Sequence, residues 1–270
     1  MGDALQPNEI SRLFEKVRAN RPLVHHITNY VTVNDCANIT LSVGASPVMA
    51  HSSHEVAEMV AQAGALVLNI GTLDTRQVER MLLAGKKANE AGVPIVLDPV
   101  GAGATKYRTK TSLKLLKELD IAVLKGNGGE IASLAGAGGQ VRGVDSAGIE
   151  GKPEQIVSGY AGKLGIVVAM TGPVDFVSDG KRTLRIDNGH PLMGRFSGSG
   201  CMAASVVGAF AAVSKDRTNA TAAALAAFAV AGEKAAVRYT TPYGVRQAIF
   251  DELYNLSPAE LSDRAKVRKV

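Results

Sequence analysis

Four short apolar runs without polar alternation constrain the fold of this chain more than any other feature. They are residues 65–70 (ALVLNI), 94–97 (PIVL), 121–124 (IAVL) and 165–170 (GIVVAM). Runs of this kind are typical of strands that are covered on both faces. Segment 76–91 between two of them has helical periodicity and ends at Gly92, a residue that commonly stops a helix. Alternating strands and helices predict an α/β fold with a mostly parallel central sheet flanked by helices.

Each predicted strand ends in polar or glycine-rich residues. These ends read Asn69-Ile70-Gly71-Thr72, Asp98-Pro99-Val100-Gly101, Lys125-Gly126-Asn127 and Thr171-Gly172. In open parallel sheets, ligands bind outside the carboxyl ends of the strands, where these loops meet. We therefore expect the chemistry of this chain at that edge of the sheet.

The composition indicates a packed globule. Hydrophobic residues make up 46% of the 270 residues and charged residues only 20%, which disfavours disorder and allows a sizeable core. The sequence has no evident internal repeat or linker, and we expect the glycine-rich segment 136–151 to be a surface loop. These observations predict a single domain over residues 1–270.

Charge and cysteine content narrow the partners and the compartment. The net charge is only +5 and aromatic residues are 4% of the chain, which argues against nucleic acid as a partner. Two cysteines, Cys36 and Cys201, suit a reducing compartment. The first residues lack the apolar region of a secretory signal, and the apolar runs 202–213 and 220–231 are shorter than a bilayer crossing needs. We expect a cytoplasmic protein without membrane contact, in which both runs are buried helices.

The stretch 196–205, FSGSGCMAAS, places Cys201 behind a glycine loop at the start of a predicted helix. Glycines let several backbone N–H groups approach an anion, and a helix N-terminus adds partial positive charge, so the loop is a candidate phosphate or oxyanion cradle. A helix start also favours the thiolate of a cysteine. The alternative is a glycine turn before a buried helix, with Cys201 as packing.

Two common catalytic motifs are missing from the sequence. The Gly-Lys pairs that begin at residues 85, 151, 162 and 180 are not followed by Ser or Thr, as the lysine-bearing phosphate loop requires. Ser199 is flanked by Ser197 and Cys201 where the hydrolase elbow has glycines. A thiol hydrolase stays open, because one of the histidines at 25, 26, 51, 54 and 190 could pair with Cys201.

Charged and hydroxyl side chains follow three of the predicted strands. Asp98 suits either a turn before proline or a hydrated Mg²⁺ that bridges phosphates. Lys125 supplies a cation after the next strand, and Glu130 suits both a metal site and the first turn of a helix. Thr171 ends another strand and is compatible with a nucleotide phosphate, although this signal is weak by itself.

The N-terminal quarter of the chain contains a candidate wall for a small heterocycle. Asn29 could supply a hydrogen-bonding amide and Met49 an apolar surface. Against this stand a cap or turn role for Asn29 and a core position for Met49. The adjacent His25 and His26 lack the spacing of a helical metal pair, which argues against zinc.

Six blocks, taken together and in this order, resemble the hydroxyethylthiazole kinases of thiamin biosynthesis and salvage. They are 25–50 (HHITNYVTVNDCANITLSVGASPVMA), 65–74 (ALVLNIGTLD), 94–105 (PIVLDPVGAGAT), 124–131 (LKGNGGEI), 167–172 (VVAMTG) and 197–205 (SGSGCMAAS). The resemblance implies a ribokinase-like three-layer α/β fold. It also implies transfer of the ATP γ-phosphoryl group to the primary alcohol of 4-methyl-5-(2-hydroxyethyl)thiazole, with Mg²⁺.

The resemblance also implies roles for single residues. Cys201 stands where the family places its proposed base, facing the substrate hydroxyl, and Met49 and Gly198 match substrate-contacting residues. We group Asn29, the candidate amide beside the heterocycle, with these substrate-binding residues. Residues matched to ATP, to the anion loop or to Mg²⁺ are Lys125, Thr171, Ser199, Gly200, Asp98 and Glu130. The family is trimeric, with substrate pockets between subunits.

The loop departs from the family pattern at one position, and three competing functions stay open. Ser199 stands where the family commonly has threonine, which keeps the hydroxyl and loses a methyl group. Kinases of hydroxymethylpyrimidine carry a similar loop, but ITNYV and GASPVM in the N-terminal block favour the thiazole enzymes. A thiol hydrolase and a non-catalytic ligand-binding protein are the second and third competing functions.

Overall fold

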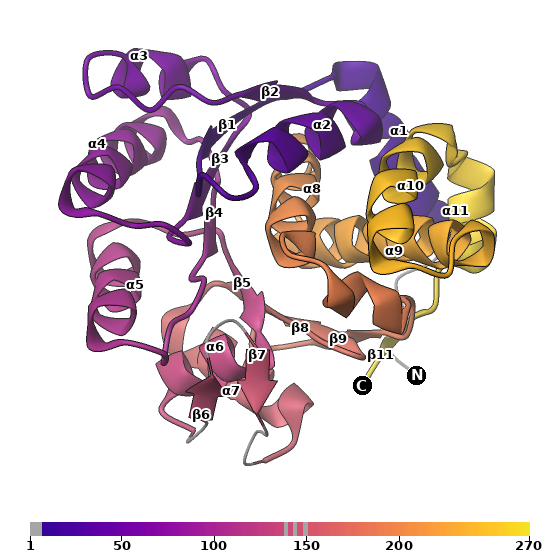
Figure 1. Ribbon diagram of the computed structural model, residues 1–270. Helices are drawn as coiled ribbons and strands as arrows, with labels where there is room; N and C mark the ends of the chain where they lie inside the picture. The colour runs from indigo at the N-terminus through magenta and orange to yellow at the C-terminus, as the bar shows by residue number, and fades with distance from the viewer. Residues whose placement is uncertain (1–6, 138–139, 143–144, 148–150) are drawn as a thin grey trace.

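The computed structural model describes residues 7–137, 140–142, 145–147 and 151–270, and a nine-stranded sheet runs through its middle (Figure 1). The strands of this sheet are β1 (Leu23–Ile27), β2 (Ser46–Val48), β3 (Ala65–Asn69), β4 (Ile95–Asp98), β5 (Val123–Asn127), β8 (Val167–Thr171), β9 (Asp175–Ser178), β10 (Thr183–Ile186) and β11 (Val267–Lys269). Their order across the sheet is β11-β10-β9-β8-β5-β4-β3-β1-β2. The pairs from β2 to β8 are parallel and those from β8 to β11 antiparallel. The prediction of a mostly parallel sheet is confirmed.

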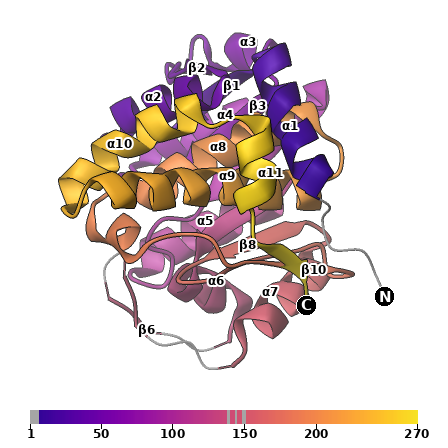
Figure 2. The same cartoon turned by 90° about the vertical axis from the view of Figure 1, so that its right-hand side faces the viewer.

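Helices cover both faces of the sheet, which makes three layers. One face carries α3 (Val56–Ala61), α4 (Thr75–Ala91), α5 (Lys106–Glu118), α6 (Gly128–Ala135) and α7 (Pro153–Leu164). The other carries α1 (Pro7–Asn20), α2 (Val33–Val43), α8 (Ser199–Val213), α9 (Arg217–Arg238), α10 (Pro242–Asn255) and α11 (Pro258–Arg264), with the 3-10 helix η1 (Pro191–Arg195) before α8. Figure 2 shows α10 and α11 on the outer side of α9.

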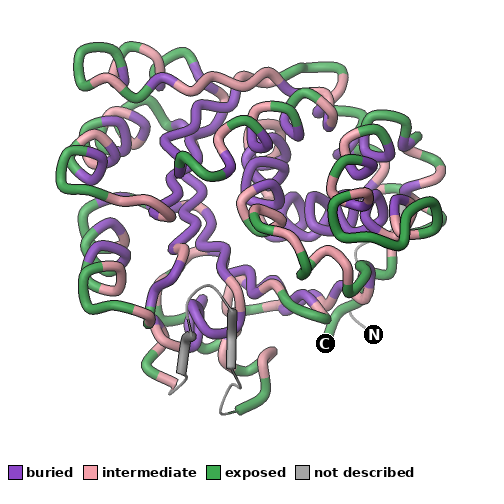
Figure 3. Tube along the Cα trace, viewed as in Figure 1, coloured by how far each residue is buried: buried purple, intermediate pink, exposed green. Residues whose placement is uncertain are grey.

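The unbroken apolar runs are explained by burial on both faces. Alternate side chains of one strand point to opposite helical layers. Val67 packs on the side of α8, whereas Leu66 and Leu68 pack on the side of α4. The central strands and most of α8 and α9 are buried (Figure 3).

The glycine and alanine content of α8 lets it approach the sheet closely. A Cβ atom on Gly208 would lie 2.7 Å from Cγ2 of Val67 on β3. Within the described ranges, α9 is also long and apolar enough to span a membrane by length and composition, but 78% of its apolar window is buried inside the molecule. Both apolar runs are therefore helices of the core, as predicted.

Local predictions are confirmed in one segment and wrong in another. The predicted helix 76–91 is α4, which begins where Asp74 caps the N–H of Gln77 and ends at Gly92, in a left-handed conformation with φ of 69°. The predicted surface loop 136–151 contains two short antiparallel strands, β6 (Gln140–Arg142) and β7 (Asp145–Ala147). Residues 138–139, 143–144 and 148–150 of that loop lie outside the described residues.

Candidate active site

The carboxyl ends of the parallel strands meet at one edge of the sheet, and the start of α8 joins them there. The register of β3 and β4 pairs Asn69 with Asp98. From the opposite side, Cys201 in the first turn of α8 reaches the same place, since its sulfur lies 3.3 Å from Nδ2 of Asn69. Asp98 and Cys201 therefore share a neighbour, although the sequence separates them by a hundred residues.

The sulfur of Cys201 accepts hydrogen bonds from two side-chain amides. Nδ2 of Asn29 and Nδ2 of Asn69 each lie 3.3 Å from Sγ. Burial and the nearby Asp98 carboxylate raise the pKa of the Cys201 thiol, and bonds from Thr32 and Asn69 together with the charge of Lys125 only partly oppose them. Burial and the Asp98 carboxylate therefore act against the helix start, which by itself favours the thiolate.

Lys125 connects Asp98 to the first turn of α8. Its Nζ atom lies 3.6 Å from Oδ1 of Asp98 and donates to the carbonyl oxygen of Gly200 at 2.9 Å. The side chain is 3% exposed, yet its pKa is raised, because the negative field of Asp98 and Glu130 exceeds the effect of desolvation. Burial raises the pKa of Asp98, and the Lys125 ammonium and the Asn69 amide oppose this. A buried cation thus faces the carboxylate at the centre of the edge.

Glu130 organises two loops at once. Its Oε1 atom accepts from the backbone N–H of Gly101 and its Oε2 atom from that of Asn127, both at 2.7 Å. The second bond belongs to a capping box that starts α6. Burial and the charge of Asp98 raise the pKa of Glu130 to about 7. The helix-start interpretation of Glu130 is therefore confirmed.

The glycine loop adopts a shape that only glycine permits. Gly198, the N-cap of α8, has φ of 98°, and a Cβ atom there would lie 2.6 Å from Cγ2 of Thr32. Among the described residues, no side chain caps this helix start, so the N–H groups of its first turn, at Ser199, Gly200 and Cys201, have no capping side chain as a partner. Free N–H groups at a helix start are suited to binding an anion.

Thr171 and Met49 lie at opposite ends of the edge. Thr171 ends β8, and its hydroxyl donates to the carbonyl of Gly126 at 3.3 Å. The next turn is fixed by Asp175, whose Oδ1 accepts from the N–H of Gly172, and burial raises the pKa of Asp175 to about 7. Met49 is partly exposed and follows β2, at the other margin of the sheet. The structure therefore separates the two flanks and gathers the polar residues between them.

Comparison with known proteins gives a consistent result. Residues 14–259 match the model of the hydroxyethylthiazole kinase family. The hydroxyethylthiazole kinase of Methanocella arvoryzae is 61% identical over 264 residues, which cover 98% of this chain and 99% of that protein. The chain belongs to the hydroxyethylthiazole kinase family.

Solved structures agree with this family and with the fold. The hydroxyethylthiazole kinase protein of Pyrococcus horikoshii superposes with a TM-score of 0.90 at 46% identity, covering 97% of this chain and 98% of that one. A ribokinase-like superfamily protein of Enterococcus faecalis gives a TM-score of 0.66 at 14% identity, covering 90% and 93%, a likeness of fold alone. The predicted ribokinase-like three-layer fold is confirmed.

The family and the geometry both disfavour the thiol hydrolase. His26 lies on the α8 side of β1 and contacts the hydroxyl of Ser205 at 3.1 Å, and burial lowers its pKa to about 4. His25 points to the other face and holds the carbonyl of Ala50 at 2.6 Å. Among the described residues, no group of three or more His, Cys, Asp or Glu is placed to hold a metal.

Sequence reasoning missed Asn69 as a member of this cluster. Besides its bond to Cys201, Nδ2 of Asn69 donates to Oδ2 of Asp98 at 2.7 Å. The signal in the sequence was a polar residue at the end of an apolar strand, in the same position as Asp98 on the next strand. Asn29, in contrast, was selected and lies in the cluster. Its amide is fully engaged, because it donates to Asn69 and Cys201 and accepts twice from Thr32.

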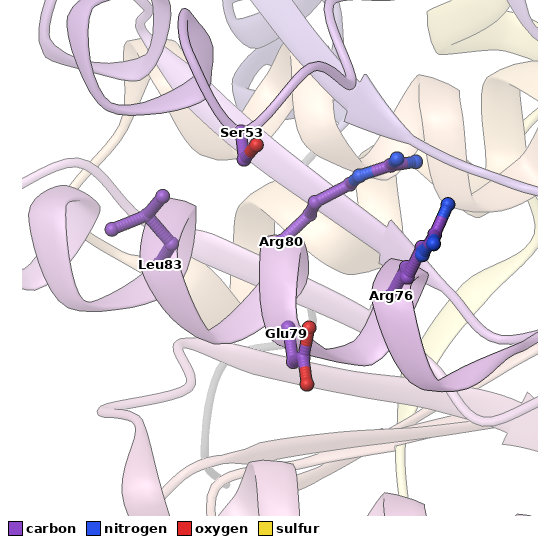
Figure 4. Close-up of a pocket in the computed structure, with 5 residues that line it drawn as sticks. All are labelled: Ser53, Arg76, Glu79, Arg80 and Leu83. Atoms are coloured by element: carbon purple, nitrogen blue, oxygen red, sulfur yellow. The ribbon is translucent and has the colours of Figure 1, made fainter.

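Two hollows elsewhere do not include the family site residues. One, of about 370 Å³, lies between α4 and the loop before α3 and is lined by Ser53, Arg76, Glu79, Arg80 and Leu83. Figure 4 shows Arg76 and Arg80 projecting from the same side of α4, while Glu79 points the other way. The other, of about 700 Å³, is a groove between α2 and α10.

Proposed function

We propose that this chain, as one kinase domain over residues 1–270, phosphorylates the primary alcohol of 4-methyl-5-(2-hydroxyethyl)thiazole with ATP at the edge around Cys201. Membership of the hydroxyethylthiazole kinase family gives the reaction and its place in thiamin biosynthesis. The observation that carries the location is the meeting of Cys201, Asp98 and Lys125 below the open start of α8.

The start of α8 suits the transferred phosphoryl group. Phosphoryl transfer depends mainly on positioning and on stabilising charge at the phosphoryl oxygens. The N–H groups of Ser199 and Gly200 would cradle that charge, and the buried Lys125 ammonium adds a positive field beside them. Lys125 and Thr171 would contact ATP from the β5 and β8 side of the edge.

The thiazole alcohol would enter from the β1 and β2 side. Met49 would form an apolar wall for the heterocycle, Gly198 would approach it closely, and Asn29 borders it beside the sulfur. In the transfer step the hydroxyl oxygen would bond to the γ-phosphorus, the bond to the ADP oxygen would break, and the hydroxyl proton would pass to the thiolate form of Cys201. General-base help of this kind typically contributes about 10²–10⁴-fold to the rate.

Asp98 and Glu130 fit a hydrated magnesium ion held partly by phosphates. Mg²⁺ usually takes one or two protein carboxylates and completes its shell with waters and phosphate oxygens. The two acidic groups are close enough for the charge of Asp98 to raise the pKa of Glu130. Because both Glu130 oxygens hold backbone N–H groups, its contact would run through water. The ion would neutralise phosphate charge during transfer.

Assembly and location belong to the same proposal. Tyr30 and Val31, directly after Asn29, are 64% and 67% exposed, and they would be covered if pockets lie between the subunits of a homotrimer. Light scattering coupled to size-exclusion chromatography measures this state. The two cysteines are both free, which supports a reducing, cytoplasmic environment.

The test is a coupled assay of ADP release with Mg-ATP, in which hydroxyethylthiazole and hydroxymethylpyrimidine are offered in parallel and the products are detected by mass. Thiazole phosphate from the first substrate alone supports the proposal. Pyrimidine phosphate would move the chain to the sister activity. If no ADP were released with either substrate, the proposed kinase activity would be overturned in favour of a ligand-binding protein.

A further inference from the structure

We propose that Asn69, acting together with Asn29, is the positioning residue that aims the sulfur of Cys201 and ties it to Asp98. The two amides form what we call the amide pair, Asn29 and Asn69. Both are almost completely buried, with exposed fractions of 3% and 1%. The inference deepens the proposed kinase function and rests on it for the reaction that Cys201 serves.

Backbone donors fix which way each amide points. The N–H of Thr32 donates to Oδ1 of Asn29 at 3.0 Å, and the N–H of Gly71 donates to Oδ1 of Asn69 at 2.9 Å. A backbone N–H can only donate, so it must face the oxygen of a side-chain amide and never its NH₂ group. The NH₂ groups of both residues are therefore forced to the other side, where Cys201 lies.

The four hydrogens of the amide pair are all assigned by this orientation. Asn29 gives one to Sγ of Cys201 at 3.3 Å and one to Oδ1 of Asn69 at 3.0 Å. Asn69 gives one to the same sulfur at 3.3 Å and one to Oδ2 of Asp98 at 2.7 Å. The chain of bonds thus runs from the end of β1 through β3 to β4, and the sulfur is its shared acceptor.

Close packing holds the amide pair in this arrangement. A Cβ atom added to Gly71 would lie 2.8 Å from Cβ of Asn29 and 3.0 Å from Oδ1 of Asn69. The backbone at residue 71 can therefore donate to Asn69 only because it carries no side chain there. The amide pair is therefore packed directly against this turn.

Two N–H donors on one side of the sulfur have a chemical consequence. They occupy its acceptor directions toward the sheet, so the remaining valence, which carries the thiol proton or receives the substrate proton, points toward the partly exposed side of Cys201. They also stabilise negative charge on sulfur, against the opposing effects of burial and Asp98. The amide pair therefore makes Cys201 a directed proton acceptor.

The first experiment measures the thiol itself, without ATP or thiazole. The rate at which the Cys201 thiolate attacks iodoacetamide, displacing iodide, is followed at about pH 8, with the label located by mass spectrometry. Cys36 is 1% exposed and its pKa is raised to about 12, so Cys201 is the reactive thiol. Asn69→Leu and Asn29→Leu, which remove one sulfur donor each at similar volume, are expected to slow alkylation about tenfold.

A matched control separates this effect from a general loss of packing. Gln77 is another buried amide at the same edge, and its Nε2 donates to the carbonyl of Thr28 at 2.9 Å. Gln77→Leu also leaves a backbone group without its partner, but it touches no donor to the sulfur, so alkylation should stay within about twofold of the wild type. If a leucine variant fails to fold, Asn69→Asp keeps the acceptor for Gly71 and still removes the sulfur donor.

The second experiment is a double-mutant cycle on kinase turnover. Asn69→Leu should lower kcat about tenfold or more and leave the KM for ATP within about twofold. In a Cys201→Ala background, the same substitution should lower kcat by less than about threefold. If Asn69→Leu lowered kcat by the same factor with and without Cys201, a role that acts through Cys201 would be overturned. Alkylation of Asn69→Leu at the wild-type rate or faster would also overturn this role. If Asn69→Leu slowed alkylation and Asn29→Leu did not, the effect of Asn69 would be assigned to its bond with Asp98 alone.

The two readouts keep this inference distinct from the proposed function. Slower alkylation together with an absence of thiazole phosphate in the wild type would remove the kinase proposal and leave the amide pair standing. Thiazole phosphate formation by the wild type, together with unchanged alkylation in the leucine variants, would support the kinase proposal and overturn the role of the amide pair.

Discussion

The two halves of the ligand edge differ in the kind of polar group they bury. The half formed by β1 and β3 presents the neutral amides of Asn29 and Asn69 to Cys201. The half formed by β5 and β8 presents Lys125, and Glu130 and Asp175 follow these strands. Asp98 on β4 lies between the halves, since it accepts from Asn69 and faces Lys125.

This difference matches the two substrates of a kinase. An amide keeps one protonation state at physiological pH, so it can fix an orientation without adding charge, which suits a neutral heterocyclic alcohol. Buried charges are costly alone and are favoured opposite a charged ligand such as a polyphosphate. The raised pKa values of Glu130 and Asp175, both about 7, show the cost of the charged half before a ligand binds.

The largest effect is expected on the neutral half, at the residue that both amides contact. Cys201→Ala should lower kcat by about 10²-fold or more, because it removes the proposed proton acceptor, and it should leave ATP binding within about twofold. Steady-state kinetics with both substrates varied measure this. Cys36→Ala is the matched control, since it deletes the other free thiol of the chain and should leave the KM for ATP unchanged. Wild-type turnover of Cys201→Ala would remove the base role.

The next effect tests the charged half. Lys125→Met keeps the length of the side chain and deletes its charge, so Asp98 loses the cation that opposes the rise of its pKa, and the carbonyl of Gly200 loses its donor. We expect kcat/KM for ATP to fall about 10²-fold, the scale for losing a charge stabiliser. Lys114→Met, at an exposed lysine of α5, serves as the control. Equal decreases of kcat/KM for ATP and for the thiazole would contradict the proposed division of the edge into an ATP half and a thiazole half.

A smaller effect is expected where the halves meet. Asp98→Asn keeps the shape beside Asn69 and removes the carboxylate, so the Mg²⁺ concentration for half-maximal activity should rise about tenfold. A Mg²⁺ titration at saturating ATP measures this, with the surface variant Asp187→Asn as the control. An unchanged titration would show that Asp98 serves Lys125 and Asn69 rather than the ion.

The sequence predicts the sheet well because burial on both faces leaves a direct pattern. A strand such as β3, with Leu66 and Leu68 on one layer and Val67 on the other, has no polar position inside it. The same reasoning places Asp98, Lys125 and Thr171 at one edge, because parallel strands align their carboxyl ends. The family resemblance then adds Cys201, which comes from a distant helix that no local pattern ties to the sheet.

The contacts inside the site were beyond the sequence for physical reasons. Asn69 closes an apolar run, and its importance comes from the register that sets it beside Asp98. The protonation of Cys201 depends on competition between a helix start, which is local, and burial with Asp98, which are not. The strands β6 and β7 lie in a glycine-rich segment, a composition that by itself favours a loop over strands.

The smallest effect concerns stability and tests how costly the charged half is. Asp175 has a pKa of about 7 in the folded protein, raised by burial above its ordinary value of 3.8. A carboxyl with a raised folded pKa contributes stability that is fully present below the unfolded pKa and is lost as pH rises through the folded value. The melting temperature should therefore fall between about pH 5 and about pH 8, and Asp175→Asn, whose side-chain oxygen still accepts from Gly172, should reduce that fall by roughly 5 °C.

Part of the pH dependence of the melting temperature should remain in Asp175→Asn, because Glu130 titrates in the same range with the same sign. Asp251→Asn on the exposed side of α10 should leave the pH dependence of wild type intact. If Asp175→Asn melted with the wild-type pH dependence, the Asp175 carboxylate would be compensated at neutral pH, and the charged half would be less costly before ligand binding than its burial indicates.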